Sequence, residues 1–229
     1  MKKTIYTAIG HLSREKDKSG MRYPVIEVNR RKYSVDVQEL VVWSALCWQF
    51  LTMDEIRVKY NAYIDQIPSE RRTLEDCVAR LRTRGLIACG EAETGGEALY
   101  ALLSELYIVP VPEKLTLRFA AFWKLLIHYG VPIRGMSELL RHDRRDASEK
   151  RIMALSHQAI LSTAELIKCV ETGVSDISTE VKLLEALYAD QHVTSDNLPD
   201  LMHSAACREN VMVAVSNLYL RKQIVFERV

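Results

Sequence analysis

The sequence has few of the residues that interrupt or staple a fold. Among its 229 residues only 9 are glycine and 6 are proline, which excludes collagen-like and low-complexity structure. Its 5 cysteines are odd in number and widely spaced, without a Cys-x-x-Cys pair, and this argues against a disulfide framework or a zinc site. We therefore expect reduced cysteines packed as small apolar side chains, and no metal or other cofactor.

Long apolar runs are missing as well. No run approaches the roughly 20 residues that a membrane span needs, and the basic start lacks the apolar stretch of a signal peptide. Apolar residues nevertheless make up 48% of the chain and charged residues 27%, a balance that allows a sizeable core. We expect a cytoplasmic, globular protein that does not contact a membrane.

Neither sign of charge is in clear excess. The 31 lysines and arginines nearly balance the 30 aspartates and glutamates, so a protein whose whole surface binds nucleic acid is not expected. The charges are unevenly distributed, because residues 1–40 hold most of the positive excess. Any contact with nucleic acid must therefore come from a local basic patch.

Catalytic motifs are also absent. The sequence has no glycine-rich phosphate loop, no His-Glu-x-x-His and no Gly-x-Ser-x-Gly, so nucleotide-binding, zinc-protease and esterase chemistry lack support. His142-Asp143 suggests a metal phosphohydrolase only weakly, because no second cluster of ligands accompanies it. We predict that the chain is not an enzyme and has no catalytic residues.

The first 36 residues are basic and have the pattern of strands. Val25–Val28 and Arg31–Val35 flank Asn29-Arg30 and predict a β-hairpin. We expect Thr4–Ala8 as a further strand beside this hairpin and Ser13–Gly20 as a loop. The segment is either an arm along a DNA backbone or an ordinary hairpin.

The pattern becomes helical at Val37. Thr52 is a helix N-cap that predicts a second helix over Met53–Ile64. A third helix is expected from about Thr73 to Arg84, ended by Gly85. A strand follows from Leu86, then a turn at Thr94-Gly95-Gly96 and an apolar return over Leu99–Val111.

Two stretches of this region resemble the winged-helix form of helix-turn-helix found in bacterial transcriptional regulators. They are Leu51-Thr52-Met53-Asp54-Glu55-Ile56 and Leu74-x3-Val78-x2-Leu81-x2-Arg84-Gly85-Leu86-Ile87. The resemblance implies that the second helix braces the third, which enters the major groove of DNA. The expected wing, Cys89–Glu97, has three glutamates and no cation, so it is not expected to contact phosphates.

The end of the chain repeats this pattern. Leu51–Ile56 aligns with Val193–Leu198, and Leu74–Ile87 aligns with Val211–Ile224. Between the copies we expect an apolar helix over Leu115–Tyr129 and a long helix from about Asp146 to Thr172. The predicted fold is mainly α with small β-hairpins (α+β), in which two winged-helix modules are joined by a helical central region. The expected divisions are an extension at 1–36, module 1 at 37–112, central helices at 113–173 and module 2 at 174–229.

The predicted function is a sequence-specific DNA-binding regulator, with double-stranded DNA as its partner. The expected DNA contacts lie on the two third helices, at Arg71, Arg72, Thr73, Arg80, Arg82, Thr83, Arg208, Asn210 and Asn217. A homodimer is expected through the central apolar residues Phe119, Phe122, Trp123 and Leu126, and a small-molecule or protein effector is possible. The alternative is a tandem winged-helix module that binds other proteins, as in chromosome-organising complexes, without sequence-specific DNA binding.

Overall fold

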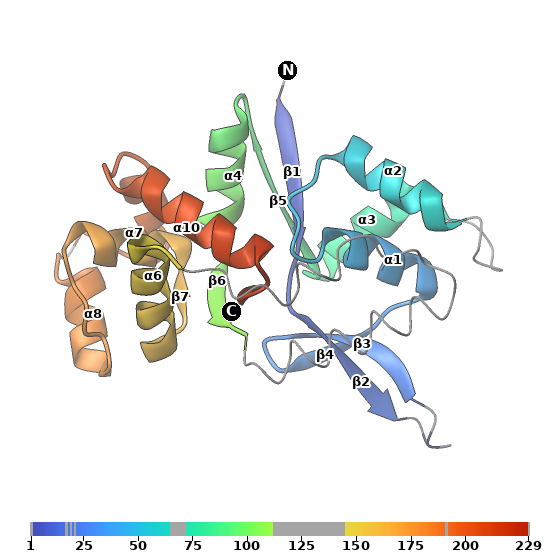
Figure 1. Cartoon of the computed structure of the whole chain (residues 1–229), viewed down its shortest axis with the longest axis horizontal. Helices are drawn as coiled ribbons and strands as arrows, with labels where there is room; N and C mark the ends of the chain where they lie inside the picture. The colour runs from blue at the N-terminus through green and yellow to red at the C-terminus, as the bar shows by residue number, and fades with distance from the viewer. Residues whose placement is uncertain are drawn as a thin grey trace.

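The computed structural model describes residues 2–16, 18, 20, 22–64, 72–111, 145–190 and 192–228. In these residues the chain combines helices with small antiparallel sheets (Figure 1), which confirms the predicted α+β class. The strands form a pair β1-β5, a sheet β2-β3-β4 and a sheet β7-β6-β8.

The sheet β2-β3-β4 comes from the basic N-terminal segment. β3 (Arg22–Val28) and β4 (Arg31–Ser34) form the predicted hairpin, and Asn29 and Arg30 both adopt the positive φ that a two-residue turn requires. The predicted loop is wrong, because His11–Lys16 forms β2 and pairs with β3. β2 is mostly polar, so it lacks the alternation that would have marked it as a strand.

The segment predicted to accompany this hairpin lies elsewhere. β1 (Lys3–Ala8) pairs with β5 (Ile87–Ala92), and Tyr6 forms an additional bridge to Leu51. Gly10, with φ +80°, separates β1 from β2, and a side chain there would collide with the Glu27 carbonyl. The two strands therefore leave this glycine for different sheets.

The first three helices lie where the sequence predicted them. α1 (Val37–Leu46) begins with a capping box between Asp36 and Glu39. α2 (Met53–Ile64) follows, and α3 (Leu74–Thr83) begins at the N-cap Thr73. Gly85, with φ +69°, takes the left-handed conformation after α3.

The predicted wing is wrong. After β5 the chain forms α4 (Gly95–Leu103), and only then β6 (Tyr107–Pro110). Thr94 caps α4 by accepting a hydrogen bond from the Glu97 amide. α4 lies so close to β5 that a Cβ atom on Gly90 would sit 2.1 Å from the Ala98 carbonyl oxygen, and this packing replaces a wing hairpin.

The predicted long helix is two helices. α6 (Ala147–Gln158) and α7 (Thr163–Glu171) are separated by the short strand β7 (Leu161–Ser162). Ser162 and Glu165 form a capping box that starts α7. The chain then forms α8 (Glu180–Tyr188), α9 (Leu198–Met202), α10 (Arg208–Leu220) and β8 (Ile224–Glu227).

One arrangement of elements occurs twice. The first copy consists of β1, α1, the Leu51 bridge, α2, α3 and β5, and the second consists of β6, α6, β7, α7, α10 and β8. In each copy the first strand pairs with both the last strand and the residues that precede the second helix. The structural equivalent of Leu51-Thr52 is thus Leu161-Ser162 rather than Val193-Thr194, and α8 and α9 are inserted between the second and third helices.

Matching buried ion pairs support this equivalence. Glu39 of α1 contacts Arg84 at the end of α3, and Glu149 of α6 contacts Arg221 at the end of α10. Both carboxylates are only 1% exposed and both belong to capping boxes. Each arginine is the C-cap of its helix and precedes a residue with positive φ.

The two copies share one hydrophobic core. Gly10 N–H donates to the Phe226 carbonyl at 2.7 Å, and Trp48 Nε1 donates to the Ile224 carbonyl at 3.0 Å. The sheet β7-β6-β8 joins residues from three of the predicted divisions of the chain. The boundaries drawn at 112/113 and 173/174 therefore cut across this sheet.

Candidate nucleic-acid interface

α3 is the helix that the resemblance assigns to DNA. Its apolar residues Leu74, Cys77, Val78 and Leu81 are buried, and the other side of the helix faces solvent. Arg72, Arg80 and Thr83 are all exposed. Arg80 and Thr83 lie three residues apart on that side. Arg72 precedes the N-cap Thr73, and it reaches the N-terminal end of α1 as Arg80 does, so the three predicted residues form one exposed stripe.

Two arginines of this stripe are oriented by α1. Arg72 forms an ion pair with Asp36, and its backbone N–H donates to Gln38 Oε1 at 2.9 Å. Arg80 donates from Nε to Glu39 Oε1 at 2.6 Å. Their charges are thus partly neutralised, a feature that the sequence does not show because the partners are about 40 residues away.

The ion pairs affect the pKa values of these groups. Partial burial acts to raise the pKa of Asp36, but hydrogen bonds from the Glu39 amide and the Arg72 side chain outweigh it, and the pKa is lowered. The hydrogen bond to Glu39 raises the pKa of Arg80 further. Asp36 and Arg80 therefore stay charged at neutral pH.

The remaining predicted residues near α3 differ in their roles. Arg82 is exposed and forms no ion pair with any residue that the structure describes. Thr83 donates to the Ala79 carbonyl, and Thr73 accepts from the Asp76 amide as the N-cap. Arg71 lies outside the described residues. Arg82 is therefore the cation of this helix with the least structural role.

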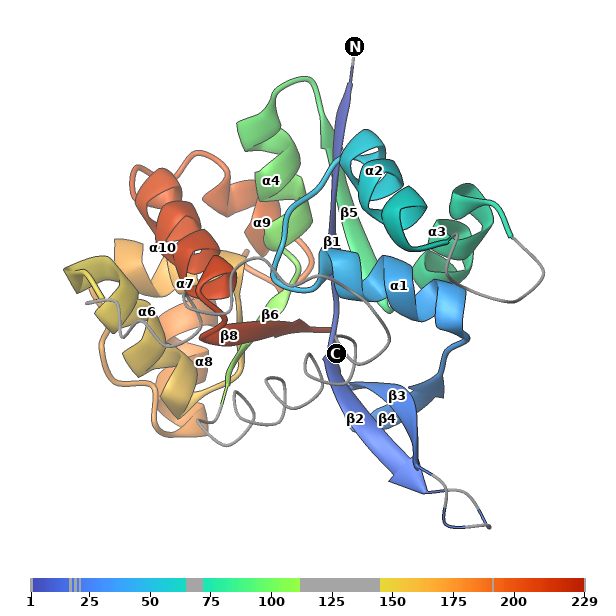
Figure 2. The same cartoon turned by 45° about the vertical axis from the view of Figure 1, so that its right-hand side comes forward.

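The predicted residues of α10 do not join this stripe. α3 and α10 lie on opposite sides of β1 and β5 in both views (Figures 1 and 2). Arg208 is bound to Glu97 of α4 at 3.1 Å and lies over the Tyr100 ring. Asn210 is exposed, whereas Asn217 is half-buried and its carbonyl accepts from the Arg221 amide. Arg208 is thus paired with Glu97 of α4 and does not lie beside α3.

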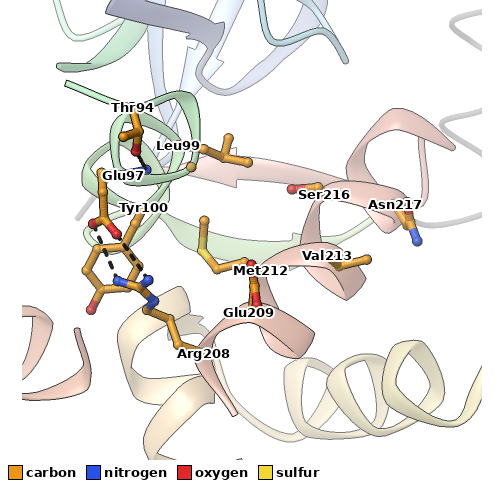
Figure 3. A pocket seen from close by; sticks show the side chains of 11 residues that line it. Thr94, Glu97, Leu99, Tyr100, Arg208, Glu209, Met212, Val213, Ser216 and Asn217 are labelled. Atoms are coloured by element: carbon orange, nitrogen blue, oxygen red, sulfur yellow. Dashed lines mark hydrogen bonds and ion pairs between the residues drawn. The ribbon is translucent and has the colours of Figure 1, made fainter. Parts of the chain in front are cut away.

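A groove of about 450 Å³ lies between α4 and α10 (Figure 3). Glu97 is paired there with Arg208, and it also contacts His203 Nε2 at 2.6 Å. Hydrogen bonds from His203 and Arg208 lower the pKa of Glu97, whereas burial raises the pKa of Tyr100 to about 12. The sequence pattern does not reveal this groove, because Thr94-Gly95-Gly96 predicts a turn of the wing where α4 begins.

The remaining predictions concern the dimer residues, membrane spans, metal sites and cysteines. Phe119, Phe122, Trp123 and Leu126 lie outside the described residues. In the part of the chain that the structure describes, no helix is both long and apolar enough to cross a membrane, and no three His, Cys, Asp or Glu residues are grouped to hold a metal. All five cysteines are free, and burial raises the pKa of Cys47 to about 12.

The chain was compared with protein-family models, with curated proteins and with solved structures. No family model, curated protein or solved structure matches it.

Proposed function

We propose that the chain binds double-stranded DNA through α3 and acts as a transcriptional regulator, with its two copies as winged-helix modules. The observation that carries the proposal is the exposed, arginine-bearing stripe on the third helix of the first copy. In each copy, with the inserted α8 and α9 set aside, two helices precede this position and a strand follows it, which is the order of the winged-helix form.

The stripe has suitable chemistry for a DNA groove. The described residues bind only Nε of Arg80, so both of its Nη groups remain available for a guanine edge or a phosphate. The pairing with Glu39 limits the conformations of this side chain, which lowers the entropy lost on binding. Arg82 and Thr83 at the same end of α3 add a second guanidinium and a hydroxyl group.

A second candidate function is protein binding by the tandem modules. α10 exposes apolar side chains, with Val213 56% and Leu220 45% exposed. The segment that follows α3 is acidic, with Glu91, Glu93 and Glu97. These features favour a protein partner.

Arg82 offers the cleanest test of the DNA proposal. We expect Arg82→Ala with Thr83→Ala to weaken binding of genomic fragments by about tenfold or more, while the fold is kept because neither side chain packs in the core. Fluorescence anisotropy at several salt concentrations measures the affinity and its salt dependence. Lys150→Ala removes an exposed cation from α6 as a control. Unchanged binding in the double variant would refute the role of α3, and a wild-type chain that binds no fragment at low salt would favour the protein-binding function.

Dimerisation remains part of the proposal, because a single helix makes few contacts for a specific site. Light scattering of the wild-type chain and of Trp123→Asp tests it. We expect a dimer that the substitution dissociates, and a wild-type monomer would contradict this part of the proposal.

A further inference from the structure

The two faces of the sheet β2-β3-β4 have different electrostatics. Directly paired residues of an antiparallel sheet project to the same face, so the register defines two sets. The Ile26 face consists of Leu12, Arg14, Lys16, Arg22, Pro24, Ile26, Val28, Arg31 and Tyr33. The Glu27 face consists of His11, Ser13, Glu15, Tyr23, Val25, Glu27, Lys32 and Ser34.

On the Glu27 face the cationic groups have acidic partners. Lys32 forms an ion pair with Glu15 across the sheet. His11 lies 3.8 Å from Glu27 and 3.8 Å from Glu227 of β8. This face is therefore balanced in charge.

The Ile26 face carries four cations without such partners, Arg31 at one end and Arg14, Lys16 and Arg22 together at the other. Lys16 lies directly opposite Arg22, and Arg14 is two residues before Lys16 on the same strand. Arg14, Lys16 and Arg22 are exposed, and none of the three forms an ion pair or hydrogen bond with a side chain among the residues described. Like charges placed directly opposite each other destabilise a sheet, so the fold does not benefit from this cluster of Arg14, Lys16 and Arg22.

The Ile26 face also contacts the C-terminal end of α3, through Tyr33 and Arg84. Ile26 and Val28 lie in the same core as Val42 and Trp43 of α1. On this face the guanidinium carbon of Arg84 lies 5.8 Å from the centroid of the Tyr33 ring. Arg84 also donates a hydrogen bond to the Ser34 carbonyl. Because Arg84 is the C-cap of α3, the face that carries the cluster continues from the C-terminal end of α3.

The cluster lies at the far end of the sheet. β2 and β3 extend beyond α1 in both views, and their end projects away from the helices (Figures 1 and 2). Both strands are therefore accessible to a large ligand at this end. A rigid strand pair that holds cations at fixed spacing suits a regular row of phosphates.

We propose, on the basis of the proposed function of α3, that Arg14, Lys16 and Arg22 bind the phosphate backbone of the same DNA duplex. The cluster then supplies the contacts that a wing would make. The wing position itself is occupied by β5 and α4, and its acidic side chains repel phosphates. α3 reads the groove, and the sheet fixes the register of the protein on the duplex by contacts that do not depend on base sequence.

Anisotropy titrations with a fluorescein-labelled, mixed-sequence 30-bp duplex test this proposal, and the probe length is about three helical turns. The triple variant Arg14→Ala, Lys16→Ala, Arg22→Ala is compared with a charge-matched control, Lys3→Ala, Lys150→Ala, Lys182→Ala. We expect about a tenfold or larger rise in Kd at low salt for the cluster variant, and a salt dependence less steep by up to about 2.7 in log–log slope. The control is expected to bind within about twofold of the wild type, because its charges do not face the duplex.

A second variant separates charge from folding. Arg14→Lys with Arg22→Lys keeps the positive charge, and we expect wild-type affinity because phosphates accept lysine as a point charge. Thermal unfolding of the alanine triple variant is expected at or above the wild-type temperature, since the repulsion is relieved. Weaker binding of the lysine variant or unfolding of the alanine variant would contradict the proposal.

The remaining outcomes distinguish the two proposals. If Arg82→Ala with Thr83→Ala weakens binding and the cluster variant does not, the sheet proposal is refuted and α3 keeps its role. Equal losses in the cluster variant and the charge-matched control would show a general charge effect and refute the sheet proposal. If the wild-type chain does not bind the duplex at low salt, both proposals fail.

Discussion

α3 and α10 take the same place in the two copies, but their surroundings differ. α3 has one buried side and one solvent side, on which arginines alternate with threonine and acidic residues. α10 packs against α6 and α7, and Arg208 at its start is bound to α4. Its exposed positions include Glu209, Asn210, Val213 and Leu220, so its solvent side is neutral to acidic.

This difference shows that the two copies share their buried contacts but not their exposed side chains. Each copy keeps a buried glutamate on its first helix and an arginine at the end of its third helix. The exposed positions share no such pattern. Buried packing thus accounts for the arrangement of helices and strands that the copies share, which we call the common frame. The exposed sides of the third helices can therefore bind different partners.

The largest expected effect concerns this common frame. Glu39→Gln and Glu149→Gln each remove the charge that pairs with the C-cap arginine, and we expect each to lower the free energy of unfolding by about 3 kcal/mol. This is the lower end for a broken buried ion pair, because Arg84 and Arg221 still reach solvent. Urea unfolding at pH 7 measures both changes.

A matched exposed pair provides the control. Asp176→Asn breaks the surface ion pair with Lys182, and we expect a far smaller change in the free energy of unfolding, because solvent screens this exposed pair. A large loss for Glu39→Gln beside a negligible one for Glu149→Gln would show that the two frames are not equivalent.

The second largest effect on stability concerns the hydrogen bonds that link the first copy to Tyr219 of the second. Thr7 and the Trp48 amide both donate to the Tyr219 hydroxyl, at 2.8 Å and 2.9 Å. Burial raises the pKa of Tyr219, so the hydroxyl stays neutral. Tyr219→Phe keeps the ring packing and removes the acceptor, and we expect a loss of about 2 kcal/mol in urea unfolding.

Tyr188→Phe, in the inserted helix α8, is the matched control. Its hydroxyl donates to Glu165 at 2.9 Å and is only partly buried, so we expect a smaller loss, about 0.5–1 kcal/mol. Equal losses for the two variants would contradict a special role of Tyr219 between the copies.

A third effect compares the residues that follow the third helices. Gly85 and Lys222 both have positive φ, +69° and +63°. Gly85→Ala meets no atom within 4 Å, so its cost is confined to the backbone, and we expect about 1 kcal/mol of destabilisation. Gly96→Ala in the first turn of α4 is the control and is expected to stabilise slightly. A neutral Gly85→Ala would show that this position tolerates a side chain as well as the second copy does.

Local signals explain which elements the sequence predicted. The N-cap Thr52 indicates where α2 begins, and the glycine at position 85 indicates where α3 ends. The same kind of signal was present but overlooked at Thr94-x-x-Glu97 and Ser162-x-x-Glu165, where α4 and α7 begin. There the glycines and the continuous apolar rows favoured a turn and a single long helix.

Local sequence patterns do not predict features that depend on contacts between residues far apart in the chain. The spacing of α3 indicated its exposed arginines, but their pairing with Asp36 and Glu39 joins residues about 40 positions apart. The charge difference between the faces of β2-β3-β4 depends on strand register, which the misplaced loop concealed. The equivalence of Leu161 with Leu51 required the pairing with β6.

The smallest expected effect tests why α10 differs from α3. Glu97 of α4 forms ion pairs with His203 and Arg208. These partners lower the pKa of Glu97 from the ordinary 4.5. The contribution of Glu97 to stability is therefore present above pH 4.5 and is lost as the pH falls through the lowered pKa. Its side chain is 37% exposed, so solvent screening keeps this contribution below about 1 kcal/mol. Unfolding of wild type and Glu97→Gln in urea should therefore differ at pH 7 and converge near the acid end of the range, whereas Glu93→Gln should follow the wild type throughout. If the Glu97→Gln difference persists undiminished in acid, the attachment of α10 to α4 does not depend on this charge, and the groove between them is held by the packing around Tyr100 instead.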